Sequence, residues 1–166
     1  MGCCLILASC NTASPEKYFD EAVLNSNLIV GFADEGLSRE LEMPSVKMSE
    51  ANGEPVPMKR SEVISTRVGF IEEHYDRIKS LSETADARDI LQASIALHEY
   101  VLKVYKKEYT ELAMLYDQET EKDKLQSYTK AIHDKYYQRF DELYNDLISK
   151  GKLYAAKHSI KVNWAM

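Results

Sequence analysis

Cysteine, glycine and proline are scarce in this 166-residue sequence. All three cysteines lie within the first ten residues, so the rest of the chain forms no disulfide and offers no thiol nucleophile. Six glycines and four prolines are too few for a collagen-like or low-complexity chain. With 45% hydrophobic and 29% charged residues, the composition is that of one ordinary globular domain. The formal net charge of −6 disfavours a general nucleic-acid binder, so we expect no nucleic-acid partner.

The sequence also lacks the spacings that assemble common catalytic and metal sites. A di-iron bundle needs Glu-x-x-His, because residues three apart share one face of a helix. The positions three before the four histidines hold Ile71, Ile95, Lys130 and Ala155. None is an acid, and His-Glu-x-x-His, paired Cys/His spacings, P-loops and Gly-x-Ser-x-Gly elbows are absent too. We therefore predict no catalytic residue, no metal site and no cofactor.

The first ten residues have the character of a targeting segment. Their apolar run is too short to cross a bilayer as a helix. Leu7-Ala8-Ser9-Cys10 resembles the lipobox of bacterial lipoproteins, in which a peptidase cuts before a cysteine that carries lipid. We expect residues 1–9 to be a signal segment with a truncated start, Cys10 to be lipidated, and residues 10–14 to form a polar tether.

Two other interpretations of this segment stay open. Met-Gly-Cys-Cys resembles a eukaryotic head that is myristoylated on Gly2 and palmitoylated on Cys3 and Cys4, although Ile6 stands where that motif prefers Ser or Thr. The third interpretation is an ordinary buried apolar start to the domain.

Apolar residues recur at steps of three and four through most of residues 15–166, which indicates an all-α domain. The predicted helices span about 15–42, 57–82, 84–116 and 125–158. No strand pattern is evident, and residues 44–57, with Asn52-Gly53 as a turn, are expected to be a long crossover loop. The sequence thus predicts an elongated four-helix bundle with a long connection between its first two helices. Residues 160–164 are expected to pack as a β-like tail on the bundle end.

Candidate contact residues lie on the apolar seams of the predicted helices. His98, Tyr105 and Tyr109 fall on the seam of the third helix, and Tyr136 falls on that of the fourth. One hypothesis makes them an interior ligand site or an aromatic surface for a partner. The other makes them core residues whose polar atoms find hydrogen-bond partners. His74 and His133 stand beside acids and are expected on solvated faces.

Several features together resemble a known group of proteins. They are the lipobox cysteine, Tyr18 with Asn25 early in the first helix, and the end Tyr154-Ala155-Ala156-Lys157-His158-Ser159-Ile160. The chain is similar to small helical lipoproteins of Bacteroidetes and spirochaetes, grouped with a leptospiral surface-protein family of unknown function. Ser159 stands where an Asn is more typical of that group, and the resemblance carries over no catalytic residue.

The resemblance implies a protein that is lipid-anchored to the outer membrane of a bacterial cell envelope. Residues 11–14 hold no acidic cluster of the kind that often marks surface export in Bacteroidetes-type lipoproteins, so we expect the periplasmic leaflet. The expected partners are the membrane, through the lipid, and a protein of the envelope. The predicted function is a non-enzymatic binding or structural module. The alternative is a helical bundle that binds a small ligand or metal at an interior His/Tyr site.

Overall fold

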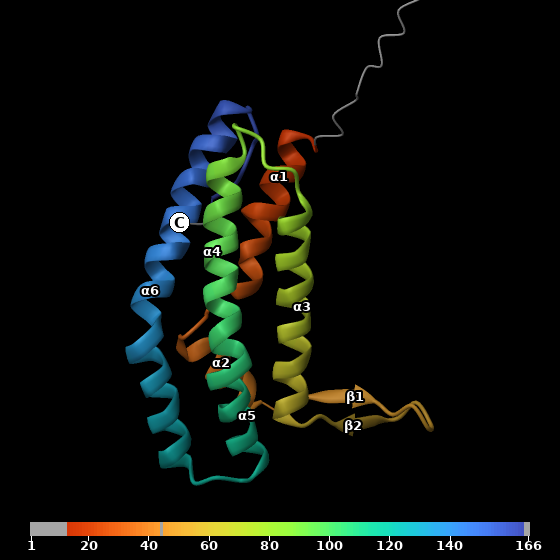
Figure 1. The fold of residues 1–166 in the computed structure, drawn as a ribbon. Helices are drawn as coiled ribbons and strands as arrows, with labels where there is room; N and C mark the ends of the chain where they lie inside the picture. The colour runs from red at the N-terminus through yellow and green to blue at the C-terminus, as the bar shows by residue number, and fades with distance from the viewer. Residues whose placement is uncertain (1–12, 44, 165–166) are drawn as a thin grey trace, which may run out of the picture.

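The computed structural model describes residues 13–43 and 45–164 of the chain (Figure 1). Helix makes up 72% and strand 4%, which confirms the all-α class. In chain order the elements are α1 (Pro15–Ala22), η1 (Leu24–Ile29), α2 (Glu35–Glu42), β1 (Val46–Met48), β2 (Pro55–Pro57), α3 (Arg60–Ser80), α4 (Arg88–Val104), η2 (Tyr105–Tyr109), α5 (Thr110–Asp117) and α6 (Lys122–Lys157). Helices α3, α4 and α6 follow the long axis of the molecule, and α1 contacts all three (Figure 1).

The prediction of one continuous helix over residues 15–42 is wrong. The chain begins α1 as expected, because the Ser14 hydroxyl accepts a hydrogen bond from the Lys17 amide at 3.3 Å. It then tightens into the 3₁₀ segment η1 and turns at Gly31 and Ala33, whose φ angles are +85° and +55°. Residues in a left-handed conformation cannot continue a right-handed α-helix, so the chain changes direction before α2.

Residues 44–57 were expected to form an irregular crossover, and the structure corrects this too. β1 and β2 form an antiparallel ribbon through three residue pairs, Val46–Pro57, Lys47–Val56 and Met48–Pro55. The predicted turn at Asn52-Gly53 is confirmed, with Gly53 at a φ of +71°. The ribbon projects from the lower end of α3 (Figure 1). Strands of three residues are too short to show the alternation by which a sequence reveals strands.

The other helices follow the predicted boundaries closely. α3 lies within the expected 57–82, and the third predicted helix, 84–116, is formed by α4, the π-helical turn η2 and α5 in succession. The Thr110 hydroxyl donates to the Tyr105 carbonyl oxygen at 3.0 Å, which satisfies a carbonyl in the widened turn. The predicted reversal follows, with Glu119 at a φ of +55°, and α6 begins three residues earlier than expected.

One apolar core runs along the helices, and α4 supplies its most buried face. Residues 160–164 form no strand but pack on the end of the molecule, which confirms that part of the prediction. There the ring of Trp164 meets Phe19 edge-on, with ring centroids 5.9 Å apart. This contact ties the end of the described chain to α1.

Long-range hydrogen bonds hold both ends of α3. At its C-terminal end, the Tyr18 hydroxyl of α1 donates to the Ser82 carbonyl oxygen at 2.6 Å. At its N-terminal end, the Asp117 carboxylate of α5 accepts from the amides of Arg60 and Ser61 at 2.6 and 3.0 Å. A carboxylate at a helix N-terminus satisfies free amides and complements the helix dipole. α3 is therefore fixed in position against α1 and α5.

Gly151 allows α6 to approach Val23, the C-cap residue of α1, closely. A Cβ placed at Gly151 would lie 2.8 Å from Cγ1 of Val23. Gly151→Ala is therefore expected to lower the free energy of unfolding by about 1–3 kcal/mol through overpacking, despite the better helix propensity of Ala. Gly69→Ala in α3 is the matched control, because open space surrounds its Cβ position. It is expected to raise stability by about 0.5–1 kcal/mol.

Urea denaturation of both variants measures these changes. An equal gain in stability from both substitutions would contradict a tight contact between α6 and Val23.

Candidate functional site

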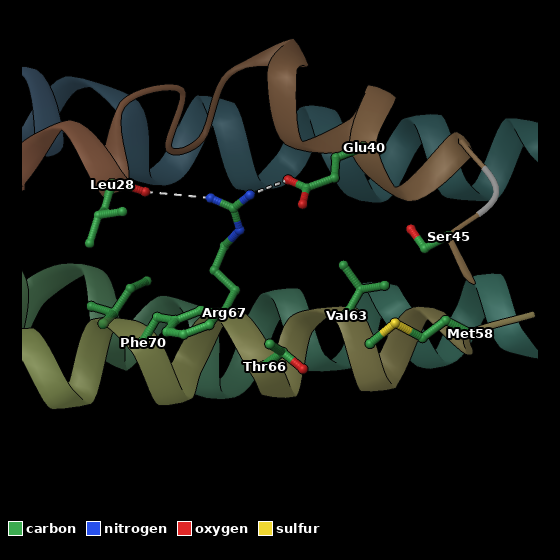
Figure 2. A pocket seen from close by; sticks show the side chains of 9 residues that line it. Leu28, Glu40, Ser45, Met58, Val63, Thr66, Arg67 and Phe70 are labelled. Carbon is green, nitrogen blue, oxygen red and sulfur yellow. Dashed lines mark hydrogen bonds and ion pairs between the residues drawn. The ribbon is translucent and has the colours of Figure 1, made fainter. Parts of the chain in front are cut away.

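A cavity of about 290 Å³ lies between α3 and the segment that contains η1 and α2. α3 supplies one wall, because Val63, Arg67 and Phe70 recur at steps of four and three on one helix face. Figure 2 shows these side chains opposite Leu28, at the end of η1, and Glu40 of α2. The cavity therefore depends on how the broken first segment lies across α3.

Arg67 spans the cavity between its two walls. Its Nη2 donates to Glu40 Oε2 at 2.5 Å, and its Nη1 donates to the Leu28 carbonyl oxygen at 3.4 Å (Figure 2). Burial acts to lower the pKa of Arg67, but the hydrogen bond to Glu40 and the negative charge of Glu40 act against it, and the pKa is raised. Burial also raises the pKa of Tyr105 to about 12, so its hydroxyl stays neutral beside the guanidinium. The cavity thus contains a cation that is already paired.

The cavity opens among exposed apolar side chains. In the part of the chain that the structure describes, ten large apolar side chains are exposed. Seven of them come from residues 24–70, namely Leu24, Leu28, Val30, Met43, Val46, Met48 and Phe70. Phe70 is 59% exposed and Leu28 43% exposed, although both line the cavity. A cavity with apolar walls around one ion pair is suited to reversible binding of a partner. Exposed apolar side chains of this kind mark binding surfaces.

Two of the predicted contact residues, Tyr105 and Tyr109, come together in an aromatic cluster. Their ring centroids lie 4.6 Å apart, and each ring lies about 6 Å from Phe32, at 6.0 and 5.8 Å. Both tyrosines are buried. Tyr109 Oη accepts a hydrogen bond from the Ala33 amide at 2.7 Å, and burial raises the pKa of Tyr109. Neither tyrosine lines the cavity, but Tyr105 contacts Arg67, which does.

Tyr136, the third predicted tyrosine, lies on α6 at the edge of this cluster. Its hydroxyl donates to Glu108 Oε1 at 2.6 Å, and the Tyr100 hydroxyl donates to its carbonyl oxygen at 3.1 Å. Tyr128 also donates to Glu108, at 3.1 Å. The hydrogen bond from Tyr136 is the largest influence that lowers the pKa of Glu108, so the carboxylate is charged. This arrangement joins α6 to η2 and lies apart from the cavity lining.

His98, the remaining predicted residue, is fully buried on α4, one helical turn from Ser94. Its Nδ1 must donate, because its partner at 2.8 Å is the Ser94 carbonyl oxygen. Its Nε2 is buried with no hydrogen-bond partner among the described residues. Burial lowers the pKa of His98, and the charge of nearby His74 lowers it further. The structure therefore keeps His98 neutral and away from the Tyr105 and Tyr136 hydroxyls.

The prediction of a solvated face is confirmed for His133, which is exposed, and is wrong for His74. His74 is buried on α3, where its Nε2 lies 2.5 Å from Nη2 of Arg77. His133 is exposed on α6, although its Nδ1 donates to the Ala33 carbonyl oxygen at 2.7 Å. Residues adjacent in sequence do not show what the rest of the fold brings to a side chain.

Sequence reasoning also missed Arg67. Its signal was present, because Arg67 lies three residues after Ile64 and four before Ile71, both on the apolar seam of that helix. A cation at such a position needs a partner when the helix packs, and Glu40 provides it here.

Cys10, the predicted lipidation site, lies outside the described residues. Within residues 13–43 and 45–164, no helix is long and apolar enough to cross a membrane. The same residues contain no group of three or more His, Cys, Asp or Glu side chains placed to hold a metal ion. Comparison with family models, curated proteins and solved structures finds no match to the chain.

The buried, neutral His98 predicts a dependence of stability on pH. Because the pKa of His98 is lower in the folded state than its ordinary value of 6.5, the unfolded chain binds a proton that the folded chain does not. This contribution to stability is complete above pH 6.5 and is lost as the pH falls toward the lowered pKa. The free energy of unfolding is expected to fall by up to about 1.4 kcal/mol per pH unit below pH 6.5.

Urea denaturation between pH 8 and pH 5 measures this slope. His98→Gln should reduce it, because Gln keeps a donor for Ser94 but does not titrate. The slope that remains includes the contribution of His74, because burial lowers the pKa of that residue too. An unchanged slope in His98→Gln would show that His98 does not titrate as described.

Proposed function

We propose that the chain is a lipid-anchored protein of the bacterial cell envelope that binds a partner and catalyses no reaction. The observation that carries this proposal is Leu7-Ala8-Ser9-Cys10, followed by the short polar tether and then by a helical domain that begins at Pro15. A lipid on Cys10 would tether the domain, and the cavity beside α3 would be its binding site. The absence of an acidic run in residues 11–14 supports the periplasmic leaflet of the outer membrane.

The place of the cavity relative to the tether supports a binding role. α1 begins beside the C-terminal end of α3, where Tyr18 is bonded to Ser82 (Figure 1). Arg67 lies thirteen residues before Ser80, which is about 20 Å along the helix axis. A lipid at the N-terminal end would therefore leave the cavity and the ribbon on the part of the domain that is remote from the anchor.

We also propose that the architecture is an elongated four-helix bundle. Its first helix would be the broken segment that comprises α1, η1 and α2, and its third would comprise α4, η2 and α5. The contacts of α1 with α3, α4 and α6 support this interpretation.

One observation favours the alternative, an interior site for a small ligand. The buried Nε2 of His98 accepts no hydrogen bond from the described residues, and a bound donor would satisfy it. We rank this alternative second, because the fold does not gather His98 with the Tyr105 and Tyr136 hydroxyls that were expected to complete such a site.

The lipid anchor is tested on protein expressed from its own gene with its native upstream sequence. Labelling with an alkyne analogue of palmitate, followed by mass spectrometry of the N-terminal peptide, is expected to find a mature chain that begins at lipidated Cys10. Cys10→Ser should lose the label and move the protein to the soluble fraction.

The variant with Cys3→Ser and Cys4→Ser is the matched control and should keep the label, because both residues are removed with the signal segment. An unmodified Met1 in membrane-free fractions would overturn the proposal. Myristate on Gly2 would favour the eukaryotic interpretation instead.

The binding role of the cavity predicts where a partner contacts the domain. A photo-crosslinking amino acid in place of Phe70 is expected to yield an adduct of one discrete size in cells. The same group in place of Leu153, which is 73% exposed on α6, should yield none. Gel electrophoresis after irradiation compares the two. Equal adducts at both positions, or none at Phe70, would contradict a binding surface at the cavity.

A further inference from the structure

The ribbon has two edges, and the hydrogen-bond register shows which backbone groups lie on each. The Ser49 amide donates to the Glu54 carbonyl at 2.7 Å, and the Met58 amide donates to the Ser45 carbonyl at 2.8 Å. Bonded and non-bonded pairs alternate in an antiparallel ladder, so Lys47–Val56 is the bonded pair between them. The pairs on either side, Val46–Pro57 and Met48–Pro55, therefore point their backbone groups away from the partner strand.

The outer edge of β2 is blocked, whereas the outer edge of β1 is open. Both outward positions of β2 are prolines, Pro55 and Pro57, which have no N–H to donate. Both outward positions of β1, Val46 and Met48, carry an N–H and a carbonyl. Neither has a hydrogen-bond partner for these groups among the residues that the structure describes. Proline on an edge prevents strand addition, so the ribbon is protected on one side only.

The apolar face of the ribbon is turned outward. Residues directly opposite in a ladder share a face, so Val46, Met48, Pro55 and Pro57 lie on one side of the ribbon. Lys47 lies on the other side and forms an ion pair with Glu62 of α3, which turns that side toward the helix. Val46 and Met48 are accordingly 65% and 64% exposed. Two solvated apolar side chains thus stand directly beside the open backbone groups.

We propose that the open edge of β1 receives an extended segment of a protein partner as a third strand. This inference rests on the proposed binding function and names the kind of partner. The segment would place apolar side chains at alternate positions against Val46 and Met48, and an acidic residue between them opposite Lys47. Such addition gives affinity through main-chain hydrogen bonds and specificity through alternate side chains.

The surroundings of β1 favour a partner segment over a second copy of this chain. Two copies of β1 that pair antiparallel through both outward residues would place Lys47 opposite Lys47, and like charges directly opposite destabilise a pair of strands. The cavity also reaches the base of the ribbon, where Ser45 and Met58 both line it, one residue before the open edge begins at Val46. A segment that leaves the edge can therefore continue into the cavity.

The experiment uses the purified full chain and a capped peptide of sequence Thr-Val-Asp-Val-Thr. NMR titration is expected to shift the Val46 and Met48 amides saturably, with a dissociation constant below about 1 mM. Hydrogen exchange of these two amides should slow when the peptide is bound. The same peptide with both valine amides N-methylated should not bind, because those amides would donate to the β1 carbonyls.

Met48→Pro is the decisive variant and is expected to weaken binding at least tenfold. It removes an outward N–H without removing a hydrogen bond to β2, so the ribbon should persist. Met48→Thr is the matched control, which keeps the N–H and should weaken binding less than threefold. The amide shifts of Lys47 and Val56 report whether the ribbon is intact in both variants.

Three results would overturn the proposal: no binding at about 1 mM peptide, equal binding by Met48→Pro, or shifts confined to other elements. A peptide with the sequence of residues 45–49 of this chain that binds as tightly as the probe would identify a second copy as the occupant instead. Lipidation at Cys10 and crosslinking at Phe70 involve other residues. If both hold while the peptide fails, only the strand addition is rejected.

Discussion

The left-handed turn at Ala33 determines how the first part of the chain lies on the long helices. This backbone conformation costs an alanine about 1–2 kcal/mol, so the rest of the fold must compensate for it. Two hydrogen bonds of 2.7 Å hold the residue, one from its amide to Tyr109 Oη and one to its carbonyl from His133 Nδ1. At about 1 kcal/mol each, they offset that cost. Because Tyr109 and His133 lie on different helices, the turn is secured only when those helices have packed.

The cavity is a consequence of this turn. Phe32, immediately before Ala33, enters the aromatic cluster and anchors the break in the core, with its ring centroid 4.9 Å from that of Phe140. The chain beyond the turn then brings α2 over α3, where Glu40 meets Arg67. A straight first helix would offer no such crossing, and Arg67 would need another partner. The same constraint therefore fixes the break, the ion pair and the space around it.

The sequence predicts the regular parts of this fold and misses the parts held by distant contacts. Steps of three and four between apolar residues are enough to locate α3, α6 and the rod that contains α4 and α5. The reversal at Ala33 depends on Tyr109 and His133, which lie 76 and 100 residues away, so a pattern of neighbouring residues does not reveal it. The spacing places Arg67 on the apolar seam of α3, but nothing in the spacing identifies Glu40 as its partner. The candidate site was thus less predictable than the helices, because two segments distant in sequence meet there.

The N-terminal end of α3 holds both the ribbon and one wall of the cavity. The open edge of β1 and the cavity therefore lie at the same end of this helix. A two-stranded ribbon is only marginally stable by itself, so its position must come from its attachments. Glu62 of α3 provides two, because it accepts from the Lys59 amide at 2.9 Å and pairs with Lys47. Asp117 fixes that helix end against α5. The ribbon therefore keeps its place relative to Val63 and Arg67, the next turns of the same helix. A partner that meets the edge and the cavity together contacts groups already in position, which reduces the ordering cost of binding.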